Sequence, residues 1–360
     1  MSVNQVSLTS FNSNHKLYDQ VRPSFQESIA NKFFQDLDLD KSNKVIELAA
    51  GTGKFTKNLV EYQKHSEFEL FIVEPSSGML TTFKENYPEL KTYENSSYDL
   101  PFEDNSIDLI IAAQAFHWFA DEKSLKEFKR VLKPNGKLGL IWNFSSFQPE
   151  NNKNLLDLKI NTDKIDSKYW DKINEQVSDY DGEVPQYRKA EWRKVFKQSN
   201  YFDYSSAKDG YEIFQLDFPI SQTFDSWLSR SYITALPNSE KEKLKSKLSN
   251  VVTTFPDEAY TDSTKEFLKT NYGIFLKFNF PDDWIVNRSV FNLLISNLLK
   301  FKVVDNSKYL KIPEATSSSC PSSEFLNFCN SIFLISTLIV FKEPFCVNDV
   351  SKSISMSPNS

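Results

Sequence analysis

The chain has 360 residues, and its hydrophobic content of 40% is enough to bury a sizeable core, which excludes an intrinsically disordered protein. Its 42 basic and 48 acidic residues give a formal net charge of −6, and its lysines are scattered through helical-looking stretches, so nucleic acid is not expected as a partner. The three cysteines all follow residue 319, so the main body has no disulfide framework or cysteine-based zinc site, and no metal is expected.

The chain begins with a polar segment that leads into a helix. Residues 1–15 lack a basic stretch followed by an apolar one, so no secretory signal is predicted and the cytoplasm is the expected compartment. Apolar residues at helical spacing then predict a helix over 25–37. We assign residues 1–40 to an N-terminal helical cap segment.

Five short apolar runs alternate with helical stretches in the next hundred residues. The predicted strands are 44–49, 69–73, 91–94, 107–113 and 137–142, and the predicted helices are 56–62, 77–87 and 121–132. A Lys-Pro-Asn-Gly turn at 133–136 precedes the last of these strands. Regular alternation means parallel pairing with helices on both faces, which is the α/β class with a doubly wound sheet.

The second half of the chain is predicted to hold helical insertions and two more strands. Residues 147–209 are loosely helical, 211–220 and 273–280 alternate as strands do, and 224–248 is a helix or two. The two strands would complete a seven-stranded Rossmann-like sheet near residue 290, so one domain is expected over residues 41–290.

Residues 291–360 are predicted to be a C-terminal extension of unknown role. A Ser/Pro linker at 313–323 leads to an uncharged stretch of 17 residues at 325–341. A membrane-spanning helix needs about 20 predominantly apolar residues, and this stretch contains several Asn, Ser and Thr. A membrane anchor is therefore disfavoured, and an extra packed element or a poorly ordered appendage is the preferred interpretation.

Two glycines follow the first predicted strand, in the sequence VIELAAGTGKFT at 45–56. Such spacing indicates a ligand that lies against bare backbone. A phosphate-binding P-loop needs glycine five residues before the Gly-Lys pair and Ser or Thr after it, but Leu48 and Phe55 occupy these positions. A dinucleotide-binding loop has a third small residue, where this sequence has Thr56.

Two acidic residues favour a methyl donor over a dinucleotide. Glu74 ends the second predicted strand, where it suits a ribose diol in sites of either class. Glu47 would lie beneath the glycine turn, where it can orient the loop and meet the ammonium group of a methionine moiety. A dehydrogenase usually keeps this position apolar, because the turn faces a pyrophosphate. The alternative for Glu47 is a carboxylate that orders the loop and binds no ligand.

Six motifs in order resemble those of class I S-adenosylmethionine-dependent methyltransferases. Besides the glycine loop they include VEPSSGML at 73–80, LPFEDNSIDLIIAAQAFHWF at 100–119 and RVLKPNGKLGLIWN at 130–143. The segments HKLYDQVRPSF at 15–25 and RSYITALP at 230–237 resemble the small-molecule branch that includes the fungal trans-aconitate methyltransferases. The resemblance covers about residues 11–290 and implies S-adenosylmethionine as the cofactor.

The resemblance also implies which residues bind the methionine and ribose parts of this cofactor. Glu47, Gly51 and Gly53 would cradle the methionine end, and Glu74 would hold both ribose hydroxyl groups. Tyr18 lies in the N-terminal segment that folds over the cofactor in the family.

Other residues are implied at the adenine and the sulfonium. Met79 would pack on the adenine, and the Ser96-Ser97 pair matches the segment that meets the adenine edge. Many relatives carry Asp or Glu where Ser96 stands, so the contact with the adenine amino group departs from the family pattern. Gln114, at the end of the fourth predicted strand, would lie beneath the sulfonium.

The reaction implied by the branch is methyl esterification of a small polycarboxylic acid such as trans-aconitate. A carboxylate is ionised at neutral pH, so it needs no general base. A C- or O-methyltransferase of a lipid, sterol or quinone would need a base and an apolar pocket, which the 31 phenylalanines leave open. A third alternative is a protein that binds S-adenosylmethionine without catalysis.

Three residues are candidate catalytic or acceptor-binding groups. His117 and Trp118 follow the fourth strand, and His117 is predicted either as a base or donor for the acceptor or as a packing residue. Arg22, like Tyr18, would contact cofactor or acceptor or else pin its segment by surface pairing. Arg230 is one of only six arginines, whose paired donors suit an anionic acceptor. Weaker candidates, expected in the core or behind the site, are Trp142, Asn143 and Tyr232.

Overall fold

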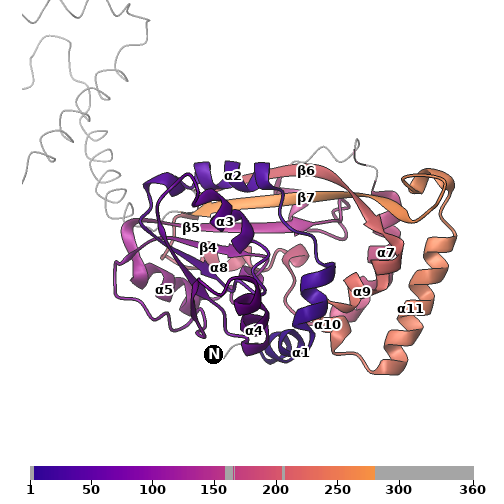
Figure 1. Ribbon diagram of the computed structural model, residues 1–360, viewed down its shortest axis with the longest axis horizontal. Helices are drawn as coiled ribbons and strands as arrows, with labels where there is room; N and C mark the ends of the chain where they lie inside the picture. Colours follow the sequence, from indigo (N-terminus) through magenta and orange to yellow (C-terminus); the bar gives the residue numbers. More distant parts are fainter. Residues whose placement is uncertain (1–3, 159–164, 166, 205–206, 280–360) are drawn as a thin grey trace, which may run out of the picture. The chain divides into compact units, whose positions relative to one another are not determined.

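The structure is a computed structural model that describes residues 4–158, 165, 167–204 and 207–279 (Figure 1). These residues belong to the first of the two units into which the chain divides, Met1–Leu298. No helix among them is long and apolar enough to cross a membrane. The predicted extension at 291–360, with its uncharged stretch, and the predicted domain end at residue 290 lie outside the described residues.

A seven-stranded sheet forms the centre of the described chain. Its strands are β1 (Lys44–Leu48), β2 (Glu69–Val73), β3 (Lys91–Tyr93), β4 (Ile107–Ala113), β5 (Leu132–Phe144), β6 (Lys208–Pro219) and β7 (Phe267–Asn279). They lie in the order β3-β2-β1-β4-β5-β7-β6. β1 to β5 pair in parallel, whereas β7 is antiparallel to both β5 and β6. The predicted α/β fold with a doubly wound, seven-stranded sheet is confirmed.

Helices cover the sheet and also form a group of their own. They are α1 (Gln5–Val21), α2 (Glu27–Asp36), α3 (Thr56–Tyr62), α4 (Ser77–Asn86), α5 (Glu122–Val131), α6 (Leu155–Leu158), α7 (Lys168–Ser178), α8 (Arg193–Gln198), α9 (Thr223–Leu228), α10 (Ser231–Thr234) and α11 (Asn238–Thr253). Figure 1 shows α7, α9, α10 and α11 gathered at one side of the molecule, with α1 between that group and α4. Side chains of these four helices share one apolar cluster, which includes Trp170 and Trp227.

Alternate side chains of the parallel strands enter two different cores. Val45 of β1 and Leu109 of β4 pack with α2 and α3 in one core, whereas Ile46 and Ile110 pack with α5 and α8 in the other. Because both faces are covered, the parallel strands are apolar along most of their length. This is why β1, β2 and β4 stand out as nearly continuous apolar runs in the sequence.

Two regions differ from the sequence interpretation. The predicted turn at 133–136 lies inside β5, because the register against β4 shifts between the pairs Ile107–Leu132 and Leu109–Lys137. The intervening residues form an irregularity within the strand instead of preceding it. The predicted helix or two at 224–248 consists of three helices, and the break between α9 and α10 places Arg230 just before α10.

Candidate active site

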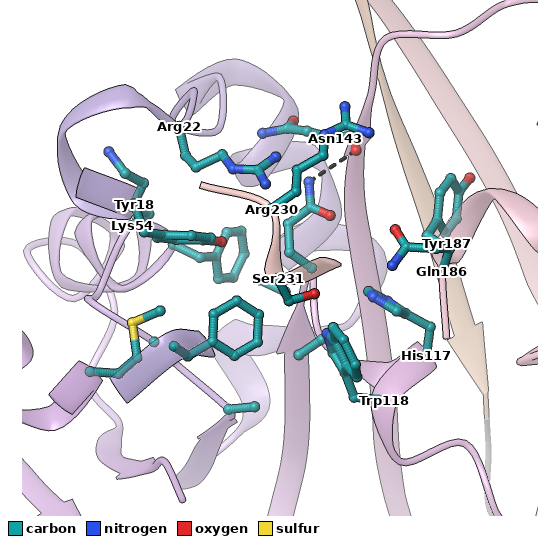
Figure 2. A pocket seen from close by; sticks show the side chains of 18 of the residues that line it. Tyr18, Arg22, Lys54, His117, Trp118, Asn143, Gln186, Tyr187, Arg230 and Ser231 are labelled. Carbon is teal, nitrogen blue, oxygen red and sulfur yellow. Dashed lines mark hydrogen bonds between the residues drawn. The ribbon is translucent and has the colours of Figure 1, made fainter. Parts of the chain in front are cut away.

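A cavity of about 270 Å³ opens at the carboxyl ends of the parallel strands. Its wall includes residues that end or directly follow β1, β2, β4 and β5, among them Gly51, Glu74, Gln114 and Asn143. Figure 2 shows ten of the lining side chains by name. Doubly wound sheets bind their ligands at this edge, so the position of the cavity agrees with the fold.

Two of the strands that reach the cavity are followed by a left-handed residue that is not glycine. Ala49 after β1 has φ 56°, and Gln114 after β4 has φ 60°. Each such residue costs on the order of 1 kcal/mol, and such conformations cluster at functional sites. Gln114 is fixed there because its backbone N–H donates to Ile141 O at 2.8 Å and its Nε2 donates to Asn143 O at 2.9 Å. The backbone therefore turns sharply at the cavity after both β1 and β4.

The glycine loop after β1 is tied to the end of β2 by Glu74. Gly51 N–H donates to Glu74 Oε2 at 2.9 Å, and Ser76 N–H donates to Oε1 at 2.8 Å. Burial raises the pKa of Glu74 to about 7 in spite of these two hydrogen bonds. A Cβ on Gly51 would meet nothing within 4 Å, whereas one on Gly53 would lie 2.5 Å from the Tyr87 ring. Gly51 therefore leaves open space at the cavity, and Gly53 allows close packing beneath the loop.

Glu47 lies beneath the glycine loop, and neither it nor Gly53 is among the residues that line the cavity. The Glu47 side chain is fully buried, and its Oε2 accepts a hydrogen bond from Thr56 Oγ1 at 2.6 Å. Oε1 has no hydrogen-bond partner in the described part of the chain. Burial raises the pKa of Glu47 to about 8, so the carboxyl group is mostly protonated at neutral pH. This arrangement orders the loop, and the contact with a methionine ammonium stays a prediction.

The residues predicted to meet the adenine all line the same cavity. Met79 is 3% exposed and lies in the first turn of α4, whose N-cap Ser76 accepts a hydrogen bond from the Met79 N–H at 3.2 Å. Ser96 Oγ accepts from the Tyr98 N–H at 3.3 Å. Ser97 Oγ is hydrogen-bonded to Ser124 Oγ at 2.9 Å. The structure thus brings all three predicted residues together with Gly51 and Glu74.

Helix α1 supplies part of the cavity wall and is fixed on both sides. Asn12 Oδ1 accepts from the Gly78 N–H of α4 at 3.0 Å. A Cβ on Gly78 would lie 2.6 Å from Asn12 O, so glycine permits the close approach of the two helices. On the other side, Asn14 Nδ2 donates to Thr234 Oγ1 of α10 at 3.0 Å. These contacts place Tyr18, further along α1, at the cavity.

Two cations lie where α1 meets the glycine loop. Arg22 follows α1 directly, and its guanidinium carbon lies 5.5 Å from the centre of the Tyr18 ring. Lys54 follows Gly53, and burial lowers its pKa while the nearby Asp19 raises it. Both cations line the cavity beside Tyr18 (Figure 2).

Arg230 is a third cation of the cavity wall. Its guanidinium carbon lies 3.6 Å from the centre of the Trp227 ring, and its Nη1 donates to Tyr232 Oη at 3.0 Å. Within the described residues Arg230 forms no ion pair, whereas a fourth lining cation, Arg188, is paired with Asp181. Among the described lining residues Glu74 is the single acidic one. The charge of the wall therefore favours anionic ligands.

His117 lies on a 3₁₀ turn, η2 (Phe116–Trp118), which begins three residues after the end of β4. Figure 2 shows its ring directed into the cavity between Gln186 and Trp118. Its Nδ1 lies 3.3 Å from Nε1 of Trp142, and burial lowers the pKa of His117 to about 3. The ring is therefore uncharged at neutral pH.

Amide and hydroxyl side chains line a further part of the cavity wall. They are Asn143, Ser145, Ser146, Asn152, Asn174, Gln186 and Ser226. Asn143 Nδ2 donates to Ser24 O at 3.5 Å, while its buried Oδ1 has no hydrogen-bond partner within the described chain. These groups can bind polar atoms of a ligand without adding charge.

Many of the lining residues were missed by the sequence analysis, and Lys54 and Gln186 are two examples. Lys54 directly follows the glycine loop, so its position next to the motif could have identified it. Gln186 precedes another 3₁₀ turn, η5 (Tyr187–Lys189), in a segment without any motif. Nothing in the sequence indicated that this segment reaches the carboxyl edge of the sheet.

Comparison with known proteins identifies the family. Residues 46–140 match the family model described as a methyltransferase domain. Over 264 residues the chain is 30% identical to an uncharacterized methyltransferase-like protein of Schizosaccharomyces pombe, and the match covers 72% of this chain and 93% of that protein. The chain belongs to the methyltransferase family. The prediction of an S-adenosylmethionine-dependent methyltransferase is thereby confirmed, with S-adenosylmethionine as the methyl donor.

Other relatives match a smaller part of the chain. An uncharacterized methyltransferase of Schizosaccharomyces pombe is 38% identical over 126 residues, which cover 35% of this chain and 49% of that protein. A ubiquinone/menaquinone biosynthesis C-methyltransferase of Campylobacter jejuni is 31% identical over 109 residues, which cover 29% of this chain and 46% of that enzyme.

Proposed function

We propose that the enzyme methylates a carboxylate of a small, anionic acceptor to give a methyl ester, with trans-aconitate as the representative acceptor. When bound, S-adenosylmethionine supplies a methyl group on a positively charged sulfur, which is an activated electrophile. The protein then has to place the nucleophile and keep water out.

The cofactor is proposed to lie at the end of the cavity formed by β1, β2 and α4. Each oxygen of Glu74 accepts one backbone N–H, and a carboxylate oxygen has a second lone pair with which to accept a ribose hydroxyl. Gly51 leaves the space in which a ligand can approach the backbone. Met79 and Ser97 line the cavity where the resemblance places the adenine.

One observation above all supports a carboxylate acceptor: neither the acidic side chain nor the histidine in the described wall of the cavity suits the role of a general base. Its single acidic side chain, Glu74, is bound by two backbone N–H groups at the cofactor end. The pKa of His117 is lowered to about 3 by burial, far below that of an effective base at neutral pH. A hydroxyl group or a carbon acid must lose a proton during methylation, whereas a carboxylate is already ionised.

Arg230 is the cation that best suits the acceptor. The ring of Trp227 and the hydroxyl of Tyr232 orient its guanidinium, and no carboxylate in the described part of the chain neutralises it. An arginine can bind a carboxylate through two parallel hydrogen bonds. Arg22 is proposed to bind either the acceptor or the methionine carboxylate, because it lies beside the glycine loop with Lys54.

The main alternative is methylation of carbon or oxygen in a lipid, sterol or quinone. It is supported by the likeness to the ubiquinone/menaquinone biosynthesis C-methyltransferase, which covers 29% of this chain. Aromatic side chains in the cavity wall, such as Phe11, Trp118 and Trp170, could also face an apolar acceptor. The amide and hydroxyl lining and the unpaired Arg230 favour the smaller polar acid.

A product screen tests the proposal. The full chain is incubated with methyl-labelled S-adenosylmethionine and separate sets of small acids, phenols, quinones and lipids, and the products are identified by mass spectrometry. We expect a methyl ester of trans-aconitate or of a similar polycarboxylate. A labelled quinone or lipid would move the alternative ahead. Tight binding of S-adenosylhomocysteine without any labelled product would instead indicate a protein that binds the cofactor without catalysis.

A further inference from the structure

We propose that Trp142 fixes His117 as a neutral ring with its proton on Nε2, and that this N–H holds one oxygen of the acceptor carboxylate while the other oxygen attacks. The inference rests on the proposed function, because it concerns the acceptor of that reaction. It also decides between the two active roles that the sequence left open for His117, base and hydrogen-bond donor.

The position of the proton follows from the partner of Nδ1. The indole Nε1 of Trp142 lies 3.3 Å from His117 Nδ1. An indole N–H can only donate, so Nδ1 must accept, and a neutral imidazole then carries its proton on Nε2. A charged imidazole would be protonated on both nitrogens and would set two donors against each other. The contact with Trp142 therefore opposes protonation of His117, as burial does.

Trp142 is held in place by its surroundings. Its side chain is fully buried and stacks on Tyr187, with the two ring centres 4.9 Å apart. The ring centre of Trp192 lies 4.7 Å from that of Trp142. Its backbone belongs to β5, which is paired with β4 on one side and β7 on the other. Because His117 is on the turn after β4, both partners of the hydrogen bond are carried by neighbouring strands.

The Nε2 proton is the group that His117 offers to a ligand. In the described chain the hydrogen bond with Trp142 is the only one that the His117 side chain makes. The ring is directed into the cavity between Gln186 and Trp118 (Figure 2). A donor in a partly buried cavity needs an acceptor atom, and a carboxylate oxygen is a strong one. The charged or titratable groups in the cavity wall are Tyr18, Arg22, Lys54, Glu74, Tyr98, Tyr187, Arg188, Arg230 and Tyr232.

A neutral donor suits this reaction because no proton has to move. One carboxylate oxygen stays bound to the His117 N–H, and the other uses a lone pair to form the bond to the methyl carbon. The carbon–sulfur bond breaks at the same time, and its electron pair stays on sulfur. The reacting carboxylate and sulfonium become a neutral ester group and a neutral thioether, and the remaining carboxylates of the acceptor are unchanged, so the charges balance without a base. Arg230 supplies the opposite charge, and His117 sets the direction of the carboxylate.

The tautomer is tested without cofactor or acceptor. The protein has three histidines, so nitrogen-15 labelling of imidazoles gives three sets of resonances, and the His117→Asn variant identifies those of His117. We expect a neutral ring protonated on Nε2, with no titration between about pH 5 and 8. In Trp142→Phe, which keeps an aromatic ring but loses the donor, both tautomers should appear. A ring protonated on Nδ1, or a charged ring at pH 6.5, overturns the proposal.

The role toward the acceptor is tested with trans-aconitate in the presence of S-adenosylhomocysteine. Addition of trans-aconitate should shift the His117 Nε2 resonance. The His117→Phe variant should raise the KM for trans-aconitate at least about tenfold, because a hydrogen bond to a charged group is lost. The His117→Gln variant, whose amide can place a donor near the position of Nε2, should recover most of this loss. The affinity for S-adenosylhomocysteine should stay unchanged in both variants.

The failures of the two proposals can be told apart. If the ester forms while the Nε2 resonance and the KM of His117→Phe stay unchanged, the role of His117 is overturned and the proposed function stands. If neither trans-aconitate nor any other small acid of the product screen is bound or methylated, the proposed function is overturned together with the role of His117.

Discussion

The two ends of the cavity are built from different parts of the protein. At the end near β1, β2 and β4, which we call the backbone-built end, the turns after the strands shape the wall, with Ala49 and Gln114 in left-handed conformations and Glu74 bound to backbone N–H groups. The end near α7, α9 and η5, which we call the side-chain-built end, carries long side chains such as those of Arg230 and Gln186. The backbone at the end of a strand can shift only if the strand itself moves. A side chain on a short helix, in contrast, can be replaced by a substitution while the backbone stays in place. We infer that the first end fixes the methyl donor and the second selects the acceptor.

The two ends also differ in charge. The end near β1 and β2 contains two buried carboxyl groups, Glu47 and Glu74, whose pKa values are raised to about 8 and about 7 by burial. The part of the wall that carries Arg230 and His117 has no acidic lining residue among those described. Substitutions at the first end should therefore change the stability of the protein and its affinity for the cofactor. Substitutions at the second end should change only the KM for the acceptor.

The largest effect is expected from Glu74→Ala. This change removes the acceptor of two ribose hydroxyl bonds, each worth on the order of 1.5–3 kcal/mol, and releases the glycine loop from β2. The affinity for S-adenosylhomocysteine, measured by calorimetry, should fall at least tenfold, and by at least about a hundredfold if both bonds are lost fully. Glu69→Ala, at the exposed start of the same strand, is the matched control. An unchanged affinity, or tighter binding of a nicotinamide dinucleotide, would sink this assignment.

The second effect is a pH dependence of stability that Glu47→Gln should remove. The pKa of Glu47 is raised to about 8, so the folded protein holds a proton that the unfolded chain loses near its ordinary value of 4.5. The resulting stability is fully present below about pH 4.5 and is lost as pH rises through about 8. By pH 7 the loss amounts to about 3 kcal/mol. Glu74 acts in the same direction, with a pKa of about 7.

Urea unfolding of the cofactor-free protein at pH 5 and pH 7 measures this effect. We expect Glu47→Gln to be much more stable relative to the parent protein at pH 7 than at pH 5, because a glutamine cannot ionise. The control is Glu69→Gln, which changes an exposed carboxyl group. Identical pH profiles for the parent and Glu47→Gln would show that Glu47 does not keep its proton in the folded protein.

The sequence indicated the strands and the glycine loop of the backbone-built end because these features are local. Strands buried on both faces are continuous apolar runs, and the loop that follows β1 has two glycines with φ 62° and 92°. Glu74 was identified because it ends a predicted strand. The irregularity at 133–136 was interpreted as a turn, since Pro-Asn-Gly has the same local signature in a turn and in an interrupted strand.

The side-chain-built end was less predictable because its contacts join distant parts of the chain. The hydrogen bond between Trp142 and His117 links β5 to the turn after β4, across 25 residues. Arg230 was expected from the resemblance, but its orientation by Trp227 depends on the break between α9 and α10. Gln186 reaches the cavity from a segment without regular spacing. Such contacts are fixed by tertiary packing, which no local pattern encodes.

A third, smaller effect separates the two glycines of the loop. Gly53→Ala places a Cβ 2.5 Å from the Tyr87 ring and forces a left-handed alanine, so the free energy of unfolding should fall by about 2–3 kcal/mol. Gly51→Ala has φ 62° but open space around its Cβ, so about 1 kcal/mol of stability should be lost. Its methyl group would occupy part of the cofactor space, however, so S-adenosylhomocysteine binding should weaken more in Gly51→Ala. Equal losses of stability in both variants would contradict this division.

The smallest effect is expected at the side-chain-built end, from Arg230→Lys. Lysine keeps the positive charge but loses the planar pair of donors and the stacking on Trp227. The KM for trans-aconitate should rise about tenfold, equivalent to about 1.4 kcal/mol, while the affinity for S-adenosylhomocysteine barely changes. Arg130→Lys serves as the control, because Arg130 lies on α5 and pairs with Asp104 and Glu127 outside the cavity wall.

Arg22→Lys, measured in parallel, shows how far the division between the two ends extends. Arg22 packs on Tyr18 where α1 meets the glycine loop, so it can reach the cofactor end, whereas Arg230 is held on Trp227 of α9. If Arg22 binds the methionine carboxylate, Arg22→Lys should weaken the binding of S-adenosylhomocysteine as well as raise the KM for the acceptor. If it binds the acceptor, only the KM should rise, as for Arg230→Lys. A KM that neither substitution changes would mean that the acceptor is recognised elsewhere, and methylation of a lipid or quinone would become the better explanation of the cavity.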